Sequence, residues 1–314
     1  PEAKAKKKRV TPDPDQPKKP TRRFGKTKRE IADMFRTMPF MIPSICGVLL
    51  FFILPFFVVI YYAVIDSNTT ANFVGFENFT KLFQNAAFKL ALKNTGTFSL
   101  TAVPFAVILS LALAVLLDRE LPMKSVFRTI FLSPMIVPAA SIILIWQVIF
   151  DYNGLINEIT ALFGAAPVEW LKSDYGYIVV VLLFLWKNIG YNMILFMAAI
   201  GNIPKYPIEA AEVDGAGSVR IFFSIKLRYL SPSILFVLII SLINSFKVFR
   251  EIYLLTGNYP YQSLYTLQHF MNNMFRKFDY QKLSAASMIM FVVMVAIVGV
   301  LFIVEDKFGR DVEQ

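Results

Sequence analysis

The chain contains a single cysteine, Cys46, and a single histidine, His269. One cysteine forms no intrachain disulfide and no cysteine zinc cluster. One histidine excludes sites that need several histidine ligands and argues against a serine–histidine catalytic triad. Charge is also scarce, because 17% of the 314 residues are Asp, Glu, Lys or Arg, against about a quarter in an average soluble domain. These shortages argue against a soluble enzyme.

The net charge of +10 is concentrated at one end of the chain. Residues 1–38 contain 13 Lys or Arg and 5 Asp or Glu, a net of +8, which leaves +2 for the other 276 residues. This segment has few large apolar side chains, so it is expected to be a disordered basic tail. No folded basic face supports nucleic-acid binding. The tail is either a solvated cytoplasmic extension or a segment that contacts anionic lipid headgroups.

Long apolar runs dominate the rest of the chain, which is 56% hydrophobic overall. About 20 apolar residues in a helix suffice to cross the hydrocarbon core of a bilayer. We therefore expect an all-α membrane protein with a domain of six transmembrane helices over 39–305. The six predicted spans are 40–65, 95–117, 129–150, 175–203, 231–255 and 283–304.

The loop charges predict the orientation of these spans, because basic residues gather on the cytoplasmic side. With the N-terminus inside, the cytoplasmic segments hold 22 Lys or Arg and the opposite loops hold 7. Both termini are then cytoplasmic, including a short C-terminal segment, 306–314. On the outer side, 73–83 and 154–163 have apolar residues at helical intervals and predict short interfacial helices. These helices either cap the bundle or contribute to a docking surface for an external protein.

The cytoplasmic loop Pro204–Pro232 has the pattern of a helix, a turn and a second helix. Pro207 suits a first helical turn, where its missing N–H costs nothing. Glu209 and Glu212 would lie near the positive end of the helix dipole. Gly215 then permits a sharp turn, and an amphipathic segment follows. The loop is expected to project from the membrane as a rigid knob.

This loop resembles the EAA loop of the permease subunits of ABC importers. The resemblance rests on Glu209-Ala210-Ala211, Asp214-Gly215-Ala216 and Ile225-x-Leu227, placed before the penultimate span. The stretches VGFENFTKLF, FRT at 127–129 and FKVFREIYLLTGNYP at 246–260 are similar to the carbohydrate branch, with maltose-type and multiple-sugar-type permeases. Relatives commonly have proline where this chain has Arg228, so the helix there is expected to continue without a bend.

The resemblance implies a type I importer permease in a bacterial inner membrane. In that family, the loop over 204–218 is a coupling helix that inserts into a cytoplasmic ATPase subunit. The implied ATPase-coupling residues are Glu209, Ala210, Ala211, Asp214, Gly215 and Ala216. The implied partners are a second similar permease, two ATPase subunits that bind ATP and magnesium, and an extracytoplasmic sugar-binding protein. This chain itself would bind no cofactor and catalyse no reaction.

Two predicted spans carry charges near mid-depth, at Lys187 and Lys247. A charge there costs about 2.5–3.5 kcal/mol and normally faces a bundle interior or a watery cavity. Neighbouring polar groups share helix faces with them. The candidates for a substrate path are Lys187, Asn188, Tyr191, Asn192, Asn244, Lys247 and Glu251. A structural alternative is that Lys247 pairs with Glu251 and the asparagines bridge helices.

Two other classes of protein fit the sequence less well. A secondary transporter or channel would need inverted repeats or broken helices around a midplane ion site, and no such paired segments are evident. A membrane-embedded enzyme lacks clustered carboxylates in the spans. The chain has no P-loop either, because Pro20 stands where the first glycine before Gly25-Lys26-Thr27 is required. ATP would therefore be handled by another chain.

Overall fold

The computed structural model describes residues 28–118 and 122–309, and these residues are almost entirely helical. The chain divides into two compact units, 1–57 and 58–314. Within the described part, an isolated antiparallel bridge between Ile65 and Phe73 is the only β pairing. The sequence prediction of an all-α protein agrees with this architecture.

The first unit contains the first apolar helix. Its described elements are α1 Lys28–Val48, the π-helical turn Leu49–Ile53 and the start of α2 Leu54–Ala63. Met38–Ala63 is long and apolar enough to cross a membrane. The predicted disordered tail lies outside the described residues as far as position 27, whereas 28–38 are helical. Once an apolar span has formed a helix, extension into the preceding residues adds a hydrogen bond for each residue fixed.

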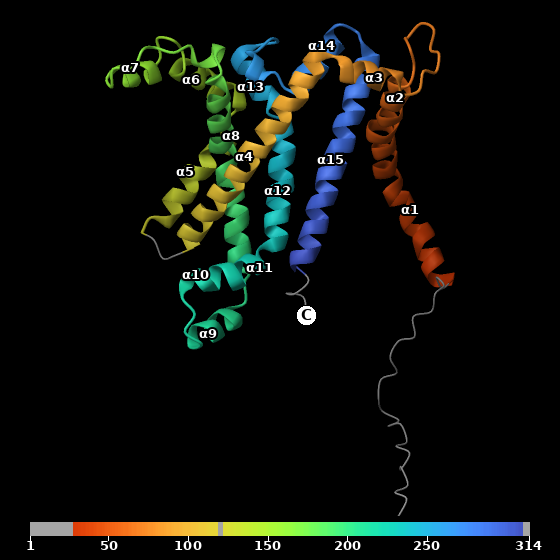
Figure 1. Ribbon diagram of the computed structural model, residues 1–314. Helices are drawn as coiled ribbons and strands as arrows, with labels where there is room; N and C mark the ends of the chain where they lie inside the picture. The colour runs from red at the N-terminus through yellow and green to blue at the C-terminus, as the bar shows by residue number, and fades with distance from the viewer. Residues whose placement is uncertain (1–27, 119–121, 310–314) are drawn as a thin grey trace, which may run out of the picture. The chain divides into compact units, whose positions relative to one another are not determined.

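The second unit is built around three long helical segments that lie side by side (Figure 1). These are α4 Ala86–Asp118, α8 Gly176–Gly201 and α12 Ser231–Phe246. α15 Tyr280–Gly309 packs against α12, and α14 Leu267–Arg276 packs against α4 and α15. The remaining elements are α3 Glu77–Gln84, α5 Lys124–Ile136, α6 Ala139–Ile149, α7 Leu155–Ala161, α9 Lys205–Val213, α10 Ser218–Ile221, α11 Leu227–Tyr229, α13 Phe249–Thr256 and the 3-10 turns Trp170–Lys172 and Gln262–Leu264.

The short elements gather at the two ends of this bundle. α3, α6, α7, α13 and α14 lie at one end, and α9 and α10 lie at the other (Figure 1). α3 and α7 coincide with the short helices predicted over 73–83 and 154–163. The relative sides of the loops therefore agree with those predicted from loop charge.

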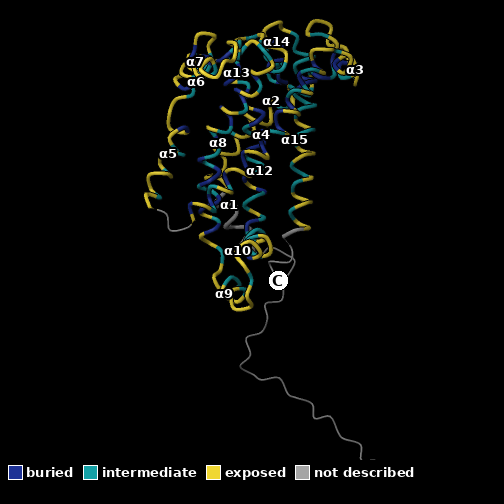
Figure 2. The backbone as a smooth tube through the Cα atoms, turned by 60° about the vertical axis from the view of Figure 1, so that its left-hand side comes forward, coloured by how far each residue is buried: buried dark blue, intermediate teal, exposed yellow. Residues whose placement is uncertain are grey.

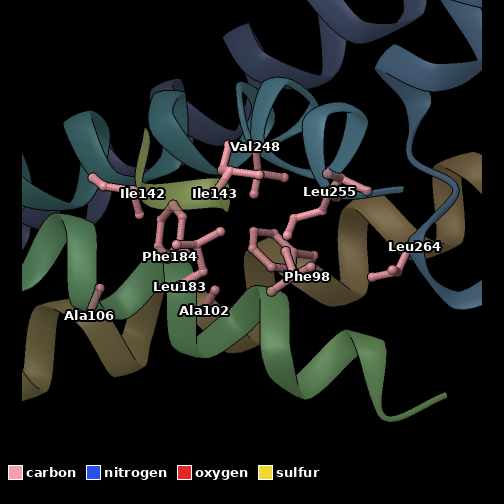
Figure 3. Packing of buried hydrophobic residues seen from close by; sticks show 12 residues of the cluster. Phe98, Ala102, Ala106, Ile142, Ile143, Leu183, Phe184, Val248, Leu255 and Leu264 are labelled. Carbon is pink, nitrogen blue, oxygen red and sulfur yellow. The ribbon is translucent and has the colours of Figure 1, made fainter. Parts of the chain in front are cut away.

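The core of the second unit lies where α4, α8 and α12 meet, as Figure 2 shows by the concentration of buried residues there. One cluster joins Phe98 and Ala102 on α4 to Leu183 and Phe184 on α8, with Val248 above them (Figure 3). The small alanines on α4 let the helices approach closely, as is common in membrane bundles. Packing, rather than a water-driven hydrophobic effect, stabilises such contacts in lipid.

The third predicted span, 129–150, differs from the structure. α5 and α6 meet at an angle of 98°, with the break between Ile136 and Ala139. Pro138 supplies no backbone N–H, and Val137 before it adopts an extended ψ of 134°. The predicted span over 129–150 is therefore a sharply bent pair of helices in the structure. The described chain has five helices that qualify as spans, or six if this bent pair is counted as one.

Gly190 on α8 allows the backbone of α5 to pass very close. A Cβ at this position would lie 1.8 Å from the carbonyl oxygen of Phe131. No real Cβ approaches backbone atoms that closely, so any side chain would push α5 away from α8. Gly190 thus sets the spacing of these two helices.

We expect Gly190→Ala to destabilise the protein by about 1–3 kcal/mol, the usual range for an overpacked core. Gly96→Ala is the matched control, because a Cβ at this helical glycine meets nothing within 4 Å. The control should be neutral or slightly stabilising, since alanine favours helix over glycine by up to about 1 kcal/mol. Thermal unfolding of both purified variants checks this, and equal midpoints would contradict the close approach.

His269 is fully buried near the start of α14. Its Nδ1 lies 2.9 Å from Thr266 Oγ1, and the two residues form a capping box. Its Nε2 has no hydrogen-bond partner among the described residues. The Phe249 ring packs edge-on against the imidazole, with 4.6 Å between the ring centroids. Burial disfavours the charged ring and lowers the pKa of His269 to about 4. The histidine is therefore a neutral structural group here.

The lowered pKa of His269 predicts a loss of stability in mild acid. The unfolded state binds the proton below its pKa of about 6.5, whereas the folded state resists protonation down to about pH 4. The contribution of His269 to the free energy of unfolding should therefore be fully present above pH 6.5, and about 2 kcal/mol of it should be lost at pH 5. The thermal midpoint of His269→Gln should fall less between pH 7.5 and 5 than that of the wild type. Parallel pH dependences would contradict this assignment.

Candidate functional site

Asparagines and serines connect α4, α8 and α12 through the centre of the bundle. Asn244 Nδ2 donates to Asn188 Oδ1 at 2.9 Å, and Asn192 Nδ2 donates to Ser241 Oγ at 2.9 Å. Asn188 and Asn192 lie one turn apart, which places both on the same face of α8. The asparagines therefore bridge helices, as the structural alternative from the sequence anticipated.

Serines add α4 to the same polar layer. Ser99 Oγ lies 2.8 Å from Ser245 Oγ, and both residues are buried. Sequence reasoning missed these serines because a hydroxyl on an apolar helix carries no signal of its own. Asn192 is also fully buried, so in this conformation it stabilises the bundle and does not contact a solute.

Glu251 pairs with Lys187 and not with Lys247. The two side chains form an ion pair between α13 and α8, with Glu251 Oε1 accepting from Lys187 Nζ. The Glu251 side chain is 10% exposed and that of Lys187 is 38% exposed. The Lys247–Glu251 pair of the structural alternative is therefore not formed, because contact with α8 brings a different lysine to the carboxylate.

The fifth apolar segment is interrupted at the point where its charges occur. α12 ends at Phe246 and α13 begins at Phe249. Around this break the backbone uses short i→i+3 hydrogen bonds, such as Lys247 N to Asn244 O at 3.1 Å and Arg250 N to Lys247 O at 3.3 Å. Lys247 and Val248 keep right-handed helical dihedrals, so Ser231–Thr256 remains one apolar helical segment with a short turn inside it.

A cavity of about 190 Å³ opens at this break. Five of the seven predicted path residues line it, and Tyr191 and Asn192 do not. Arg250 also lines it and was missed as a site residue, although it follows Lys247 by three positions. The complete lining consists of Leu183, Phe184, Lys187, Asn188, Asn244, Lys247, Val248, Arg250 and Glu251.

The loop over 204–218, which we call the α9 knob, is a helix closed by a glycine turn. Pro207 lies in the first turn of α9, as the sequence predicted. Gly215 has a φ of +79°, donates to Glu212 O at 3.0 Å, and is followed by Ala216, which donates to Ala211 O at 2.9 Å. This pair of bonds is the Schellman motif, which needs glycine at the left-handed position.

The α9 knob presents an exposed surface at the end of the bundle (Figure 2). Glu209, Ala210 and Asp214 are exposed, whereas Ala211 and Ala216 are half-buried. Large apolar groups are exposed as well, with Tyr206 at 81% and Val213 at 88%. Exposed apolar groups rimmed by charge are typical of a contact surface.

The helix after the knob continues through Arg228. The helical turns of α10, the π-helical segment Phe222–Lys226 and α11 follow one another without a gap and end at Tyr229. α12 then begins at Ser231, with Pro232 in its first turn. Ile221 and Leu230 are buried and anchor this segment to the bundle.

Comparison with known proteins identifies the family. The family model for the binding-protein-dependent transport system inner membrane component matches residues 102–312. The chain belongs to this family. The match includes the α9 knob and the cavity, and it confirms the resemblance that the sequence motifs indicated.

The relatives of this chain are transport permeases. The sn-glycerol-3-phosphate transport system permease protein of Pectobacterium atrosepticum is 31% identical over 268 residues, covering 83% of this chain and 91% of the relative. The trehalose/maltose transport system permease protein of Thermococcus litoralis is 31% identical over 241 residues, covering 76% and 81%. The arabinooligosaccharides transport system permease protein of Bacillus subtilis is 32% identical over 229 residues, covering 70% and 71%.

A solved structure shares the fold of this family member. It is a chain of a bacterial ABC transporter involved in the import of the acidic polysaccharide alginate. The two superpose with a TM-score of 0.76 over 91% of this chain and 100% of the other, at 23% sequence identity. A second structure of a bacterial alginate ABC transporter, in complex with an alginate pentasaccharide-bound periplasmic protein, gives a TM-score of 0.75 at 22% identity, covering 87% of this chain and 94% of the other.

Proposed function

We propose that this permease is one of two similar membrane subunits of an ATP-driven importer, and that it forms half of the path for a carbohydrate. An extracytoplasmic binding protein delivers the solute, and two cytoplasmic ATPase subunits bind ATP and magnesium and drive the cycle. Both termini of this chain then lie in the cytoplasm. The family membership and the carbohydrates named for the relatives support this proposal.

The observation that carries the proposal is the exposed α9 knob. It lies at the end of the bundle opposite α3, α7 and α13, and its Schellman turn fixes its shape. Small alanines permit close approach, and acidic groups at positions 209 and 214 are available to accept hydrogen bonds. Such a rigid exposed helix is suited to insert into a partner and to transmit its movement to α8 and α12.

Co-purification with the ATPase subunits tests this proposal. Val213→Asp places a charge on an apolar group of the α9 knob that is 88% exposed, and it should sharply reduce the amount of ATPase recovered with the permease. Leu162→Asp is the matched control, because Leu162 is 84% exposed at the opposite end of the bundle. Equal recovery with both variants, or no ATPase with the wild type, would contradict the proposed coupling.

A further inference from the structure

We propose that the cavity at the α12–α13 break binds an oxyanion of the transported solute, so that the solute is an acidic carbohydrate bearing a carboxylate or a phosphate. This inference rests on the proposed import function, because it names the chemical class of the cargo. It is carried by Lys247 and Arg250, two cations that line the same cavity.

Neither of these cations has a partner within the described residues. Lys247 and Arg250 take part in no ion pair, and no side-chain hydrogen bond from either is found. Both residues are exposed and line the cavity, and both lie within Ser231–Thr256, a helical segment long and apolar enough to cross a membrane. Charged residues within such an apolar segment normally face a path or a partner of opposite sign.

The charge of the lining favours an anion. Lys187, Lys247 and Arg250 contribute three positive charges, and Glu251 contributes one negative charge, so the lining has a net charge of +2. The Lys187–Glu251 pair neutralises itself. The electrostatic potential of the cavity is therefore set by the two unpaired cations, Lys247 and Arg250.

The hydrogen-bonding groups of the cavity point to the same ligand. Lys and Arg side chains only donate hydrogen bonds. Among the side-chain acceptors of the lining, Glu251 Oε1 accepts from Lys187 and Asn188 Oδ1 accepts from Asn244, which leaves Glu251 Oε2 and Asn244 Oδ1 beside the donors of Lys247 and Arg250. Neutral sugar hydroxyls need donors and acceptors, whereas a carboxylate or phosphate only accepts. The arginine fork adds the geometry that binds such oxyanions with two parallel bonds.

The size of the cavity limits how much of the solute it holds. Its volume of about 190 Å³ is smaller than the roughly 300–1,000 Å³ of sites that enclose a whole drug-sized ligand. It therefore holds one charged group or one sugar unit at a time. A chain of acidic units would pass through it stepwise.

A cysteine placed in the lining reports the sign of the electrostatic potential in this cavity, and the natural solute need not be known. Cys46 is the only cysteine of this chain, so Cys46→Ser leaves the permease without a native thiol, and the label on the permease is read after its separation from the partner subunits. Asn244→Cys in that background places a thiol in the lining, and Leu162→Cys gives an exposed reference at the end of the bundle. Both are reacted, in the assembled complex, with anionic sulfonatoethyl and cationic trimethylammonioethyl methanethiosulfonates.

We expect the anionic-to-cationic rate ratio to be about tenfold higher at position 244 than at the reference, because two nearby cations attract the anionic reagent. Adding Lys247→Gln and Arg250→Gln should bring the ratio to the reference value. A ratio already equal to the reference, or a thiol that reacts with neither reagent, overturns the proposal. If Asn244→Cys fails to fold, Lys247→Cys with Arg250 retained serves as the reporter.

Protection of the same thiol by added ligands shows whether the cavity binds an acidic sugar, a neutral sugar or inorganic phosphate. Trigalacturonate or glucose 6-phosphate should slow the modification, whereas the trimethyl ester of trigalacturonate and glucose should not. Protection by inorganic phosphate alone, or equal protection by charged and neutral sugars, overturns the assignment to an acidic solute. The readout is the reactivity of one thiol, whereas the import function is tested by ATPase recovery. A complex that recovers the ATPase but shows no charge preference at position 244 therefore overturns this inference alone.

Discussion

Gly215→Pro is expected to abolish ATP-driven uptake while the protein still inserts and folds. The φ of Gly215 is +79°, and proline fixes φ near −65° and removes the N–H that donates to Glu212 O. The Schellman turn cannot form, so the α9 knob loses the shape on which docking depends. We expect uptake to fall more than about tenfold, since proline in an incompatible position costs about 3 kcal/mol or more.

Gly164→Pro is the matched control for this change. Gly164 also has a φ of +79°, its N–H donates to Ala161 O at 2.9 Å, and it lies after α7 at the other end of the bundle. Proline therefore breaks an equivalent turn there without touching the α9 knob. For both variants we measure membrane content and the uptake of a radiolabelled carbohydrate that the wild-type importer is first shown to transport. Equal losses of uptake would show that any broken turn has this effect, and the coupling role would then be wrong. Glu209→Lys should also lower uptake, because it reverses an exposed charge of the same surface.

Lys187→Met is expected to destabilise the folded protein by about 3 kcal/mol. It leaves Glu251, which is 8% exposed, without its partner in the interior of the bundle. Removing one member of a buried ion pair typically costs about 3–5 kcal/mol, and the partial exposure of Lys187 places the expected loss at the low end. Thermal unfolding of the purified protein measures the change.

Two further variants isolate the ion pair from other effects. Lys282→Met removes a lysine of similar side-chain exposure, 39%, whose pair with Asp279 lies at the start of α15, and it should change stability by less than about 1 kcal/mol. Lys187→Met combined with Glu251→Gln removes both charges and should recover much of the loss. A double variant as unstable as Lys187→Met alone would contradict the pairing.

Local chemistry allowed the two ends of the α9 knob to be predicted from the sequence, whereas Glu209 and Glu212, expected near the start of the helix, lie beyond its first turn. Pro207 marks a first helical turn, and Gly215 marks a turn that needs positive φ, because each residue acts through its own backbone. The long spans were equally readable, since α8 and α15 differ little from the predicted 175–203 and 283–304. Features that depend on the conformation of one residue are encoded locally.

Features that depend on helix contacts were not readable in the same way. The pairing of Glu251 with Lys187 spans 64 positions and depends on how α13 packs against α8. Periodicity placed Glu251 near Lys247, but did not show which lysine it would meet. Arg250 was missed for the same reason, because its place in the cavity follows from the break between α12 and α13. The break at Pro138 was open to prediction from its proline, yet the apolar run concealed it.

Crosslinking from the α9 knob tests the central claim most directly. A photoreactive amino acid replaces Tyr206, and a second variant carries it at Phe163, which is 85% exposed at the opposite end of the bundle. In the assembled complex in membranes, position 206 should crosslink to an ATPase subunit, and position 163 should not. Crosslinks to the ATPase from position 163 alone, or from neither position, would contradict the account.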